Sequence, residues 1–185
     1  GPPCDPLAID DPDPLFFDAN CDGIDGMREG AIYVAGYGFD ENEGSRGRPV
    51  RTIQKGIELA AAQGKDVYVN EGLYEGSLVM VDGVSIYGAY GFNWKRENTA
   101  VVLIETSTDP ELDFEFGGTP AVIARDLLVG ATLADVEIQA GSAQSTGLNA
   151  IGVYVENSPA FVLERALVIV GDGAPGLNGR AAGVG

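Results

Sequence analysis

One acidic stretch near the start of the chain, residues 18–29, carries the side chains best suited to binding a metal ion. It matches the calcium-loop pattern D-x-[DN]-x-[DN]-G-x5-E, with Gly23 at the obligatory sharp turn. Calcium takes oxygen ligands, which such loops supply from short carboxylates, one backbone carbonyl and a final bidentate acid. At positions 1, 3, 5 and 12 of the pattern stand Asp18, Asn20, Asp22 and Glu29. We therefore predict a structural calcium ion here.

The same loop offers two further ligands. Ile24, at position 7, would contribute its backbone carbonyl, and Asp25, at position 8, adds a carboxylate where an apolar residue is usual. Pro12 and Pro14 precede the loop and are unsuited to an entering helix, so we predict a calcium loop without the paired helices of an EF-hand. The alternative is a turn rich in Asp, Asn and Gly that binds no metal.

The two cysteines lie in the same N-terminal segment, and one of them is inside the predicted loop. A disulfide between Cys4 and Cys21 would hold the loop against the first residues of the chain. Such a bridge implies an oxidising compartment. The alternative is a pair of free thiols.

The composition excludes several classes of function. The chain of 185 residues has 28 acidic and 11 basic side chains, no histidine, and a formal net charge of −17. Nucleic acids and anionic membrane surfaces need a basic face, so neither is an expected partner. Serine, cysteine and zinc chemistries that depend on imidazole are excluded as well. No apolar run is long enough to cross a membrane, so we expect no membrane insertion.

The elements that would position these residues are one helix and a series of short strands. Residues 52–63 carry apolar residues at helical spacing, with Thr52 as a plausible N-cap and Gly64 where a C-cap belongs. The expected strands cover residues 31–35, 66–70, 78–81, 84–87, 100–104, 121–124, 132–138, 150–155 and 161–170. From residue 67 onward they recur roughly every 15–20 residues, which is typical of a repeat architecture.

Within the strands, apolar residues alternate with others, as in Ile151, Val153 and Val155. Alternation within a loose repeat predicts a β-solenoid, in which each coil buries its inner face against its neighbours. A β-sandwich would give similar strands but more hairpin turns, and Asp-Gly at 82–83 is the only such pair between successive strands of the repeat region.

Three segments carry a family resemblance: residues 49–57, 67–74 and 84–90. Together they resemble the opening of right-handed parallel β-helix proteins of the pectin-lyase-like superfamily. The chain is similar in particular to secreted bacterial surface proteins whose β-helix follows an Asp-x-Asn-Cys-Asp-Gly-Ile-Asp segment. The resemblance implies an all-β, right-handed parallel β-helix opened by a calcium-loop segment and capped at its N-terminal end by the helix at 52–63.

Two units are expected on this basis. Residues 1–30 would form the disulfide-tied calcium-binding segment, and residues 31–185 the parallel β-helix. The C-terminal sequence is rich in glycine and carries no capping element, so the last coil would leave strand edges and core exposed. We therefore expect the N-terminal part of a longer solenoid, or self-association through the open C-terminal coil.

Other motifs are weaker. Acids alternate in an expected loop at Asp109, Glu111, Asp113 and Glu115. Paired carboxylates can hydrolyse glycosides or hold calcium, and Arg125 or Arg165 could supply a cation, but a solvated acidic loop is the simpler interpretation. Residues 171–176 match G-x-G-x-x-G, but the following residues are a poor helix, so we interpret the motif as a turn between coils.

The loop at 91–96 is the best candidate for ligand contact, through Phe92 and Trp94. Exposed aromatic rings can stack on sugars, although such rings more often pack inside the fold. Three functions remain open: a non-enzymatic secreted or cell-surface module such as an adhesin or envelope scaffold, a polysaccharide lyase or hydrolase, and a carbohydrate-binding module. We prefer the first, with a polysaccharide or another cell-envelope component as the expected partner.

Overall fold

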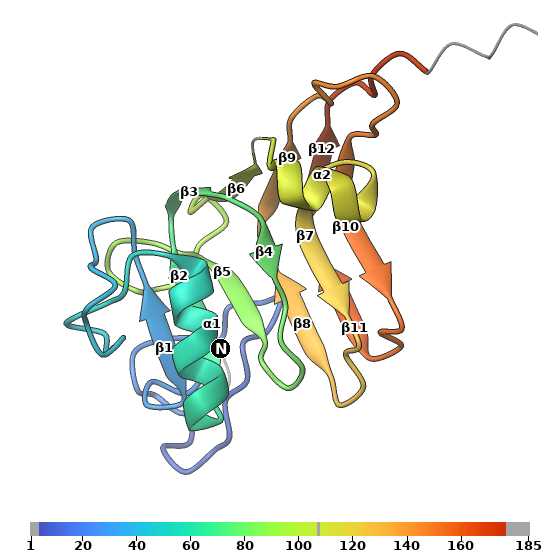
Figure 1. Cartoon of the computed structure of the whole chain (residues 1–185). Helices are drawn as coiled ribbons and strands as arrows, with labels where there is room; N and C mark the ends of the chain where they lie inside the picture. Colours follow the sequence, from blue (N-terminus) through green and yellow to red (C-terminus); the bar gives the residue numbers. More distant parts are fainter. Residues whose placement is uncertain (1–3, 107, 177–185) are drawn as a thin grey trace, which may run out of the picture.

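The strands form three all-parallel sheets that stack coil upon coil (Figure 1). The computed structural model describes residues 4–106 and 108–176. The first sheet has the order β1 (Ala31–Val34), β2 (Asp66–Asn70), β5 (Ile86–Tyr90), β8 (Ala131–Ala134) and β11 (Phe161–Glu164). The second has β3 (Gly72–Glu75), β6 (Val102–Thr106), β9 (Glu137–Ala140) and β12 (Leu167–Val170). The third has β4 (Leu78–Val79), β7 (Pro120–Arg125) and β10 (Ile151–Glu156).

From β2 onward, successive strands visit the three sheets in the same order, so the predicted parallel β-helix is confirmed. The register places apolar residues above one another inside the solenoid. Ile104 of β6 pairs with Ile138 of β9, and Ile86 of β5 pairs with Leu133 of β8, all four being fully buried or nearly so. Stacking of like residues gives the solenoid one continuous core along its axis.

The helix predicted at the N-terminal end is present as α1 (Ile53–Gln63). The Thr52 side chain accepts a hydrogen bond from the backbone N–H of Lys55, and Gly64 ends the helix in the left-handed conformation, as predicted. The buried side of α1, including Ile57, packs against β1 and β2. Figure 1 shows α1 lying along these strands at one end of the solenoid.

Gly56 has a packing role inside α1. A Cβ atom at this position would lie 2.5 Å from Cγ2 of Val34 in β1. The glycine lowers helix propensity, but it lets α1 approach the sheet closely.

The turns correct several sequence predictions. The expected strand at 132–138 is interrupted by Asp135 and the one at 161–170 by Arg165, each in the left-handed conformation with φ of 57° and 48°. A bend at these residues takes the chain from the first sheet to the second. Strand β3 occupies a stretch in which we expected no strand, and the expected loop at 109–115 is a short helix, α2 (Pro110–Phe116).

The turns between the third and first sheets are uniformly short and are bonded to one another. They cover residues 80–85, 126–130 and 157–160. The Asp82 carboxylate accepts hydrogen bonds from the backbone N–H groups of Val129 and Gly130 in the next coil. Ser158 in turn accepts one from the backbone N–H of Leu127. These turns form a ladder along one corner of the solenoid.

The first and last coils among the described residues differ in what covers them. At the N-terminal end, α1 covers β1 and β2. At the C-terminal end, β10, β11 and β12 are the last strands of their sheets among the residues described. No helix within residues 4–106 and 108–176 is long and apolar enough to cross a membrane.

Candidate functional site

The N-terminal segment is tied down at several points. The predicted disulfide is confirmed, with the Cα atoms of Cys4 and Cys21 5.5 Å apart. The buried carboxylate of Asp10 accepts hydrogen bonds from the backbone N–H groups of Ala19 and Gly26, at 3.2 and 3.1 Å. Burial raises the pKa of Asp10, and the nearby charges of the calcium-loop acids raise it further. Residues that precede the loop at 18–29, namely Cys4 and Asp10, therefore hold it in place.

The first half of the predicted calcium loop forms a tight turn around its own side chains. Asp18 accepts hydrogen bonds from the backbone N–H groups of Asp22 and Gly23, and Asn20 accepts a second one from Asp22 at 2.9 Å. Gly23 has φ of 96°, a conformation that favours glycine. The oxygen-bearing side chains of Asp18, Asn20 and Asp22 are thus gathered within one turn.

The second half of the loop is arranged differently. The Asp22 carboxylate accepts hydrogen bonds from the backbone N–H groups of Ile24 and Arg28, at 3.2 and 2.9 Å. The Ile24 side chain is buried, whereas Glu29 is exposed. Within the described residues, no three Asp, Glu or Cys side chains are placed together so as to hold a metal ion. The structure therefore does not gather Glu29 with Asp18 and Asp22.

Asp25 joins the N-terminal segment to the solenoid. Its Oδ2 lies 2.6 Å from Nη1 of Arg96, and its Oδ1 accepts a hydrogen bond from the backbone N–H of Asp13 at 3.1 Å. The Arg96 guanidinium also donates to the backbone carbonyl oxygens of Asp13 and Gly88. Desolvation raises the pKa of Asp25 to about 6, although the charge of Arg96 opposes this change. The Arg96 side chain therefore links the N-terminal segment to the solenoid.

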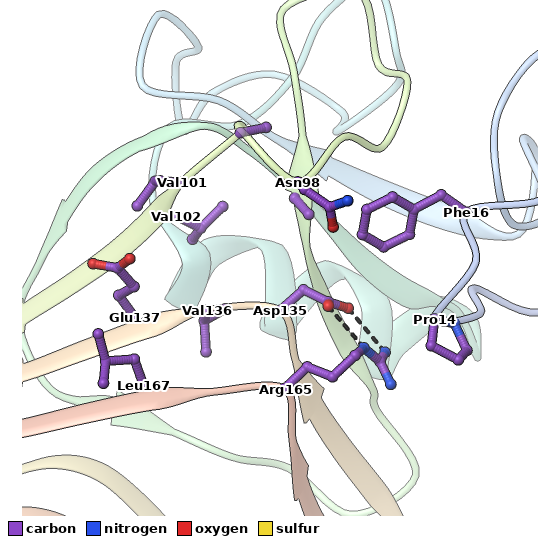
Figure 2. A pocket seen from close by; sticks show the side chains of 12 residues that line it. Pro14, Phe16, Asn98, Val101, Val102, Asp135, Val136, Glu137, Arg165 and Leu167 are labelled. Atoms are coloured by element: carbon purple, nitrogen blue, oxygen red, sulfur yellow. Dashed lines mark hydrogen bonds and ion pairs between the residues drawn. The ribbon is translucent and has the colours of Figure 1, made fainter.

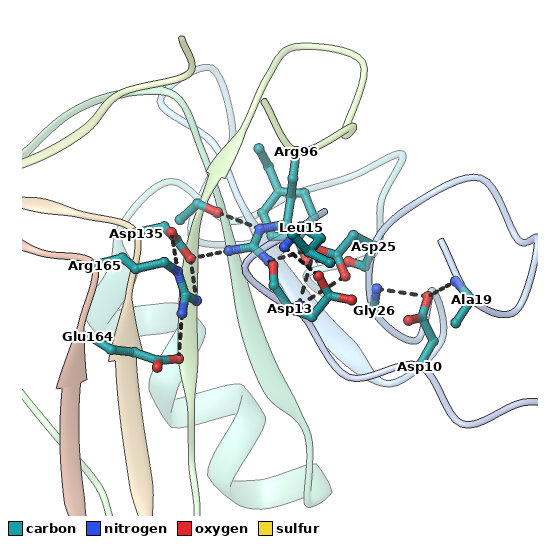
Figure 3. Close-up of polar contacts among 12 residues, drawn as sticks. Asp10, Asp13, Leu15, Ala19, Asp25, Gly26, Arg96, Asp135, Glu164 and Arg165 are labelled. Carbon is teal, nitrogen blue, oxygen red and sulfur yellow. Dashed lines mark hydrogen bonds and ion pairs between the residues drawn. The ribbon is translucent and has the colours of Figure 1, made fainter. Parts of the chain in front are cut away.

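Arg96 belongs to a series of ion pairs that we call the charge chain: Asp25, Arg96, Asp135, Arg165 and Glu164 (Figure 3). Arg96 contacts Asp135, whose carboxylate also accepts two hydrogen bonds from Arg165, at 2.8 and 2.9 Å. Arg165 Nη1 lies 3.0 Å from Glu164. Negative and positive side chains alternate along the charge chain. Because Asp25 belongs to the N-terminal segment and Asp135 and Arg165 belong to the last two described coils, the charge chain connects these parts of the molecule.

A cavity of about 290 Å³ lies beside the charge chain (Figure 2). Phe16 of the N-terminal segment lines one side, and the start of β9, with Glu137, lines another. Asp135 and Arg165 bring an acid and a cation from neighbouring coils into this cavity, but both oxygens of Asp135 are held by arginines. Hydrogen bonding to Asp135 raises the pKa of Arg165, which makes Arg165 a poor base.

Three of the four acids at 109–115 have structural roles. Asp109 caps α2 by accepting a hydrogen bond from the backbone N–H of Glu111, and Asp113 accepts one from the Thr119 hydroxyl. Glu115 lies 2.7 Å from Arg125. Each of these three acids therefore stabilises local structure.

The glycine-rich motif at 171–176 directly follows β12. The backbone N–H of Gly171 donates to the carbonyl oxygen of Ala140, as expected for a chain that continues past a parallel strand. The helix required for dinucleotide binding would fall on residues 177–185, outside the described residues.

Two glutamates that the sequence did not suggest lie side by side on the outer face of the second sheet. Glu75 of β3 and Glu105 of β6 are paired in register and line an open hollow of about 510 Å³. Neighbouring strands are about 4.8 Å apart, so the two carboxylates can approach one another. The β-alternation that places them on one face could have found them, had the position of β3 been predicted.

The aromatic residues of the 91–96 loop have separate locations. Trp94 is 4% exposed, and its ring centroid lies 4.8 Å from that of Tyr33, so it belongs to an inner aromatic cluster. Phe92 is 71% exposed and lies beside the ring of Tyr37, with 6.5 Å between centroids. The aromatic rings that a ligand could reach in this region are therefore Phe92 and Tyr37.

Comparison with known proteins gives one relative of interest. The chain is 30% identical to the uncharacterized protein YwoF of Bacillus subtilis (strain 168) over 136 residues. The similarity covers 71% of this chain and 26% of YwoF, so the chain matches about a quarter of that protein's length. No protein family and no solved structure matches the chain.

Proposed function

We propose that this chain is a non-catalytic β-solenoid module of a secreted or cell-surface protein, of the kind found in adhesins and envelope scaffolds. The charge chain supports this proposal best. Where acids and cations from different coils meet, they neutralise one another, and Asp135 keeps no free oxygen for a substrate. Groups arranged in this way hold coils together, whereas a catalytic acid or base must be able to reach a substrate.

The disulfide supports the proposed location, because such bridges persist in oxidising compartments outside the cytoplasm. The resemblance to the pectin-lyase-like superfamily favours a polysaccharide or another envelope component as partner. Phe92 and Tyr37 are the rings that would contact such a partner, since aromatic faces stack on sugar rings.

We further propose that calcium stabilises the N-terminal segment. Its ligands would be the side chains of Asp18, Asn20 and Asp22 and the carbonyl oxygen of Ile24. Glu29, which the structure places apart from Asp18 and Asp22, would complete the set by moving toward the bound ion. The Asp/Asn turn at 18–23 fits a hard cation in chemistry and conformation. Asp25 is engaged by Arg96, so it would support the loop from behind. A bound ion would also reduce repulsion among the acids around Asp10.

Calcium titration tests this proposal. We expect heat of binding in calorimetry and a lower thermal midpoint in EDTA, because the ion binds only the folded loop. The variant Asp18→Asn should lose both effects. Its matched control is Asp5→Asn, in the same segment but outside the loop. Absence of heat, together with a melting curve that EDTA leaves unchanged, would refute calcium binding and leave the module proposal standing.

One observation favours a second candidate, a polysaccharide hydrolase. Two carboxyl groups about 5–5.5 Å apart are the catalytic arrangement of retaining glycosidases, and Glu75 and Glu105 occupy adjacent strands. We would incubate the protein with plant and bacterial polysaccharides in the presence of calcium and measure reducing ends. The module proposal expects no release. Release that is lost in Glu105→Gln and retained in Glu41→Gln would establish the hydrolase instead.

A further inference from the structure

A cavity of about 370 Å³ lies where several separate parts of the chain meet beside β1. It is lined by the end of the predicted calcium loop, by β1, by the 43–47 loop and by residues at the end of α1. Its volume falls within the range of about 300–1,000 Å³ that is usual for small-ligand sites. This cavity is therefore large enough for a small organic ligand.

Three cations line this cavity, although the chain as a whole is acidic. They are Arg28, Arg46 and Lys65, three of only 11 basic side chains against 28 acidic ones. Arg46 and Lys65 are half-buried, and Arg28 is exposed. Within residues 4–106 and 108–176, none of the three forms an ion pair with a carboxylate. No described acid therefore neutralises these cations by direct contact.

The two arginines are held in position by neutral partners. Nη1 of Arg28 donates to the backbone carbonyl oxygen of Asp22 at 3.2 Å, and Nη2 of Arg46 donates to that of Asn93 at 2.9 Å. A carbonyl oxygen fixes the position of a guanidinium without cancelling its charge, and each guanidinium has five N–H donors. Both arginines therefore keep their charge and further donors for another partner.

The charges of both arginines act on the same buried hydroxyl group, that of Tyr33, which also lines the cavity. Burial raises the pKa of Tyr33. The positive charges of Arg46 and Arg28 oppose this rise, whereas the acids Asp22 and Glu29 add to it. Arg28 and Arg46 thus lie close enough together to act on one bound group.

Two acids that line the cavity determine its net charge. Glu43 is already engaged, since one carboxylate oxygen lies 3.3 Å from Arg48 and the other accepts a hydrogen bond from the Ser45 hydroxyl at 2.9 Å. Glu29 is exposed, and its side chain has no hydrogen-bond or ion-pair partner among the described residues. With Glu43 balanced by Arg48, three cations and Glu29 leave an excess of two positive charges.

We propose that this cavity binds a phosphate group, either as the free ion or on a small molecule such as a sugar phosphate. A phosphate monoester carries a charge of about −1.5 to −2 at pH 7, which matches the excess of positive charge. Guanidinium groups bind phosphate oxygens through pairs of parallel hydrogen bonds, and a lysine adds a compact charge. A carboxylate would balance only one of the two charges. The proposal does not depend on the proposed module function or on calcium.

Lys65 also has a structural explanation. It follows α1 by two residues, and a cation is favoured near the C-terminal end of a helix. A loss of stability in a Lys65 variant would therefore not distinguish the two roles, whereas a loss of phosphate binding would.

Isothermal titration calorimetry of the full chain tests the proposal, with sodium phosphate, glucose 6-phosphate and glucose as separate titrants. The buffer contains no calcium, so that calcium phosphate cannot form. We expect the protein to bind phosphate ligands and not glucose. Tighter binding of glucose 6-phosphate than of inorganic phosphate would identify a sugar phosphate as the ligand, and equal or weaker binding would identify the free ion.

Matched variants locate the binding site. Arg46→Gln and Lys65→Gln should each weaken binding about tenfold or more, because each removes a charged hydrogen-bond donor. Arg51→Gln and Lys95→Gln make the same changes at exposed residues outside the cavity and should leave the affinity unchanged. Circular dichroism establishes that each variant is folded.

A variant with the opposite expected effect gives a measurement that misfolding cannot imitate. Glu29→Gln should tighten phosphate binding severalfold, because it removes a negative charge from the cavity. Glu41→Gln, at an exposed acid outside the cavity, should not. Three results would overturn the proposal: no heat with either phosphate ligand, equal losses in the cavity variants and their controls, or glucuronate binding as tightly as glucose 6-phosphate.

Discussion

Strands β1 and β12 are alike in sequence and opposite in environment. Both are four residues long and apolar, Ala-Ile-Tyr-Val and Leu-Val-Ile-Val, and they belong to the first and the last coil that the structure describes. The residues of β1 are 0–3% exposed, whereas those of β12 are 38–51% exposed. The difference comes from their neighbours. Helix α1, the 44–50 loop and the N-terminal segment cover β1, and no described element covers β12 in the same way.

This comparison shows that elements outside the coils bury the outermost strand of a solenoid. The amino-acid composition of that strand does not determine whether it is buried. Each coil buries its inner face only against adjacent coils, so a terminal coil needs something else to cover it. At the N-terminal end, three kinds of contact hold the covering elements on the first coil: packing of α1, backbone hydrogen bonds to the 44–50 loop, and the ion pair between Asp25 and Arg96.

The largest effect is expected where the charge chain enters the sealed end. Arg96→Met should lower the free energy of unfolding by about 3–5 kcal/mol, because it leaves Asp25 and Asp135 buried without their shared cation. Arg165→Met removes a partly exposed cation near the open end, and its cost should be clearly smaller. Urea unfolding of both variants measures this difference. Equal losses would mean that burial does not distinguish the two arginines.

A matched truncation compares the two strands directly. Ile32→Ala in β1 should cost about 2–5 kcal/mol, because it leaves a cavity in the core. Ile169→Ala in β12 removes an outward-facing, half-exposed side chain and should change the stability of the monomer by no more than about 0.5 kcal/mol. The experiment is urea unfolding at a concentration low enough to exclude association. A large loss in Ile169→Ala would show that β12 is covered in solution.

The smallest effect concerns the turns between the two ends. The pKa of Asp82 lies below its ordinary value of 3.8, chiefly because the backbone N–H of Gly130 donates to its carboxylate. An acid whose pKa is lowered by folding adds stability above its unfolded pKa and loses that contribution as the pH falls through the folded value. The difference in stability between the wild type and Asp82→Ala should therefore shrink below pH 3.8.

Unfolding at several pH values measures that difference. Glu41→Ala provides the control, because no hydrogen bond or ion pair of the Glu41 side chain is present among the described residues. A difference for Asp82→Ala that stays constant down to pH 2 would contradict the assignment of the lowered pKa to the turn.

The features that could be predicted from the sequence depend on local or periodic signals. Thr52 and Gly64 bound α1 because a cap involves only the adjacent turn of the chain. The solenoid follows from alternation and spacing of apolar residues, and the Cys4–Cys21 disulfide follows from cysteine count and context. These signals are short-range, or they involve residue types with few possible partners.

The charge chain could not be predicted, because its contacts join distant parts of the sequence. Arg96 meets Asp25 and Asp135 across separations of 71 and 39 residues, and many other acids were equally available. Asp25 has the residue type and position of a loop carboxylate, so its engagement by Arg96 is visible only in the fold. The burial of Trp94 could not be predicted for the same reason. Its neighbours in the sequence are polar, whereas its contact with Tyr33 joins distant parts of the chain.

The ladder of short turns along one corner of the solenoid has a consequence for how such a chain can change. Between the third and first sheets each turn is bonded to the next, through Asp82 and Ser158, so an inserted residue would break contacts in two coils at once. The connections between the second and third sheets vary in length, from residues 76–77 in one coil to residues 107–119 in the next, and the strands on both sides still pair in register. Longer loops that bind new partners can therefore be inserted between the second and third sheets. The hydrogen-bonded turns between the third and first sheets would keep the register of the coils.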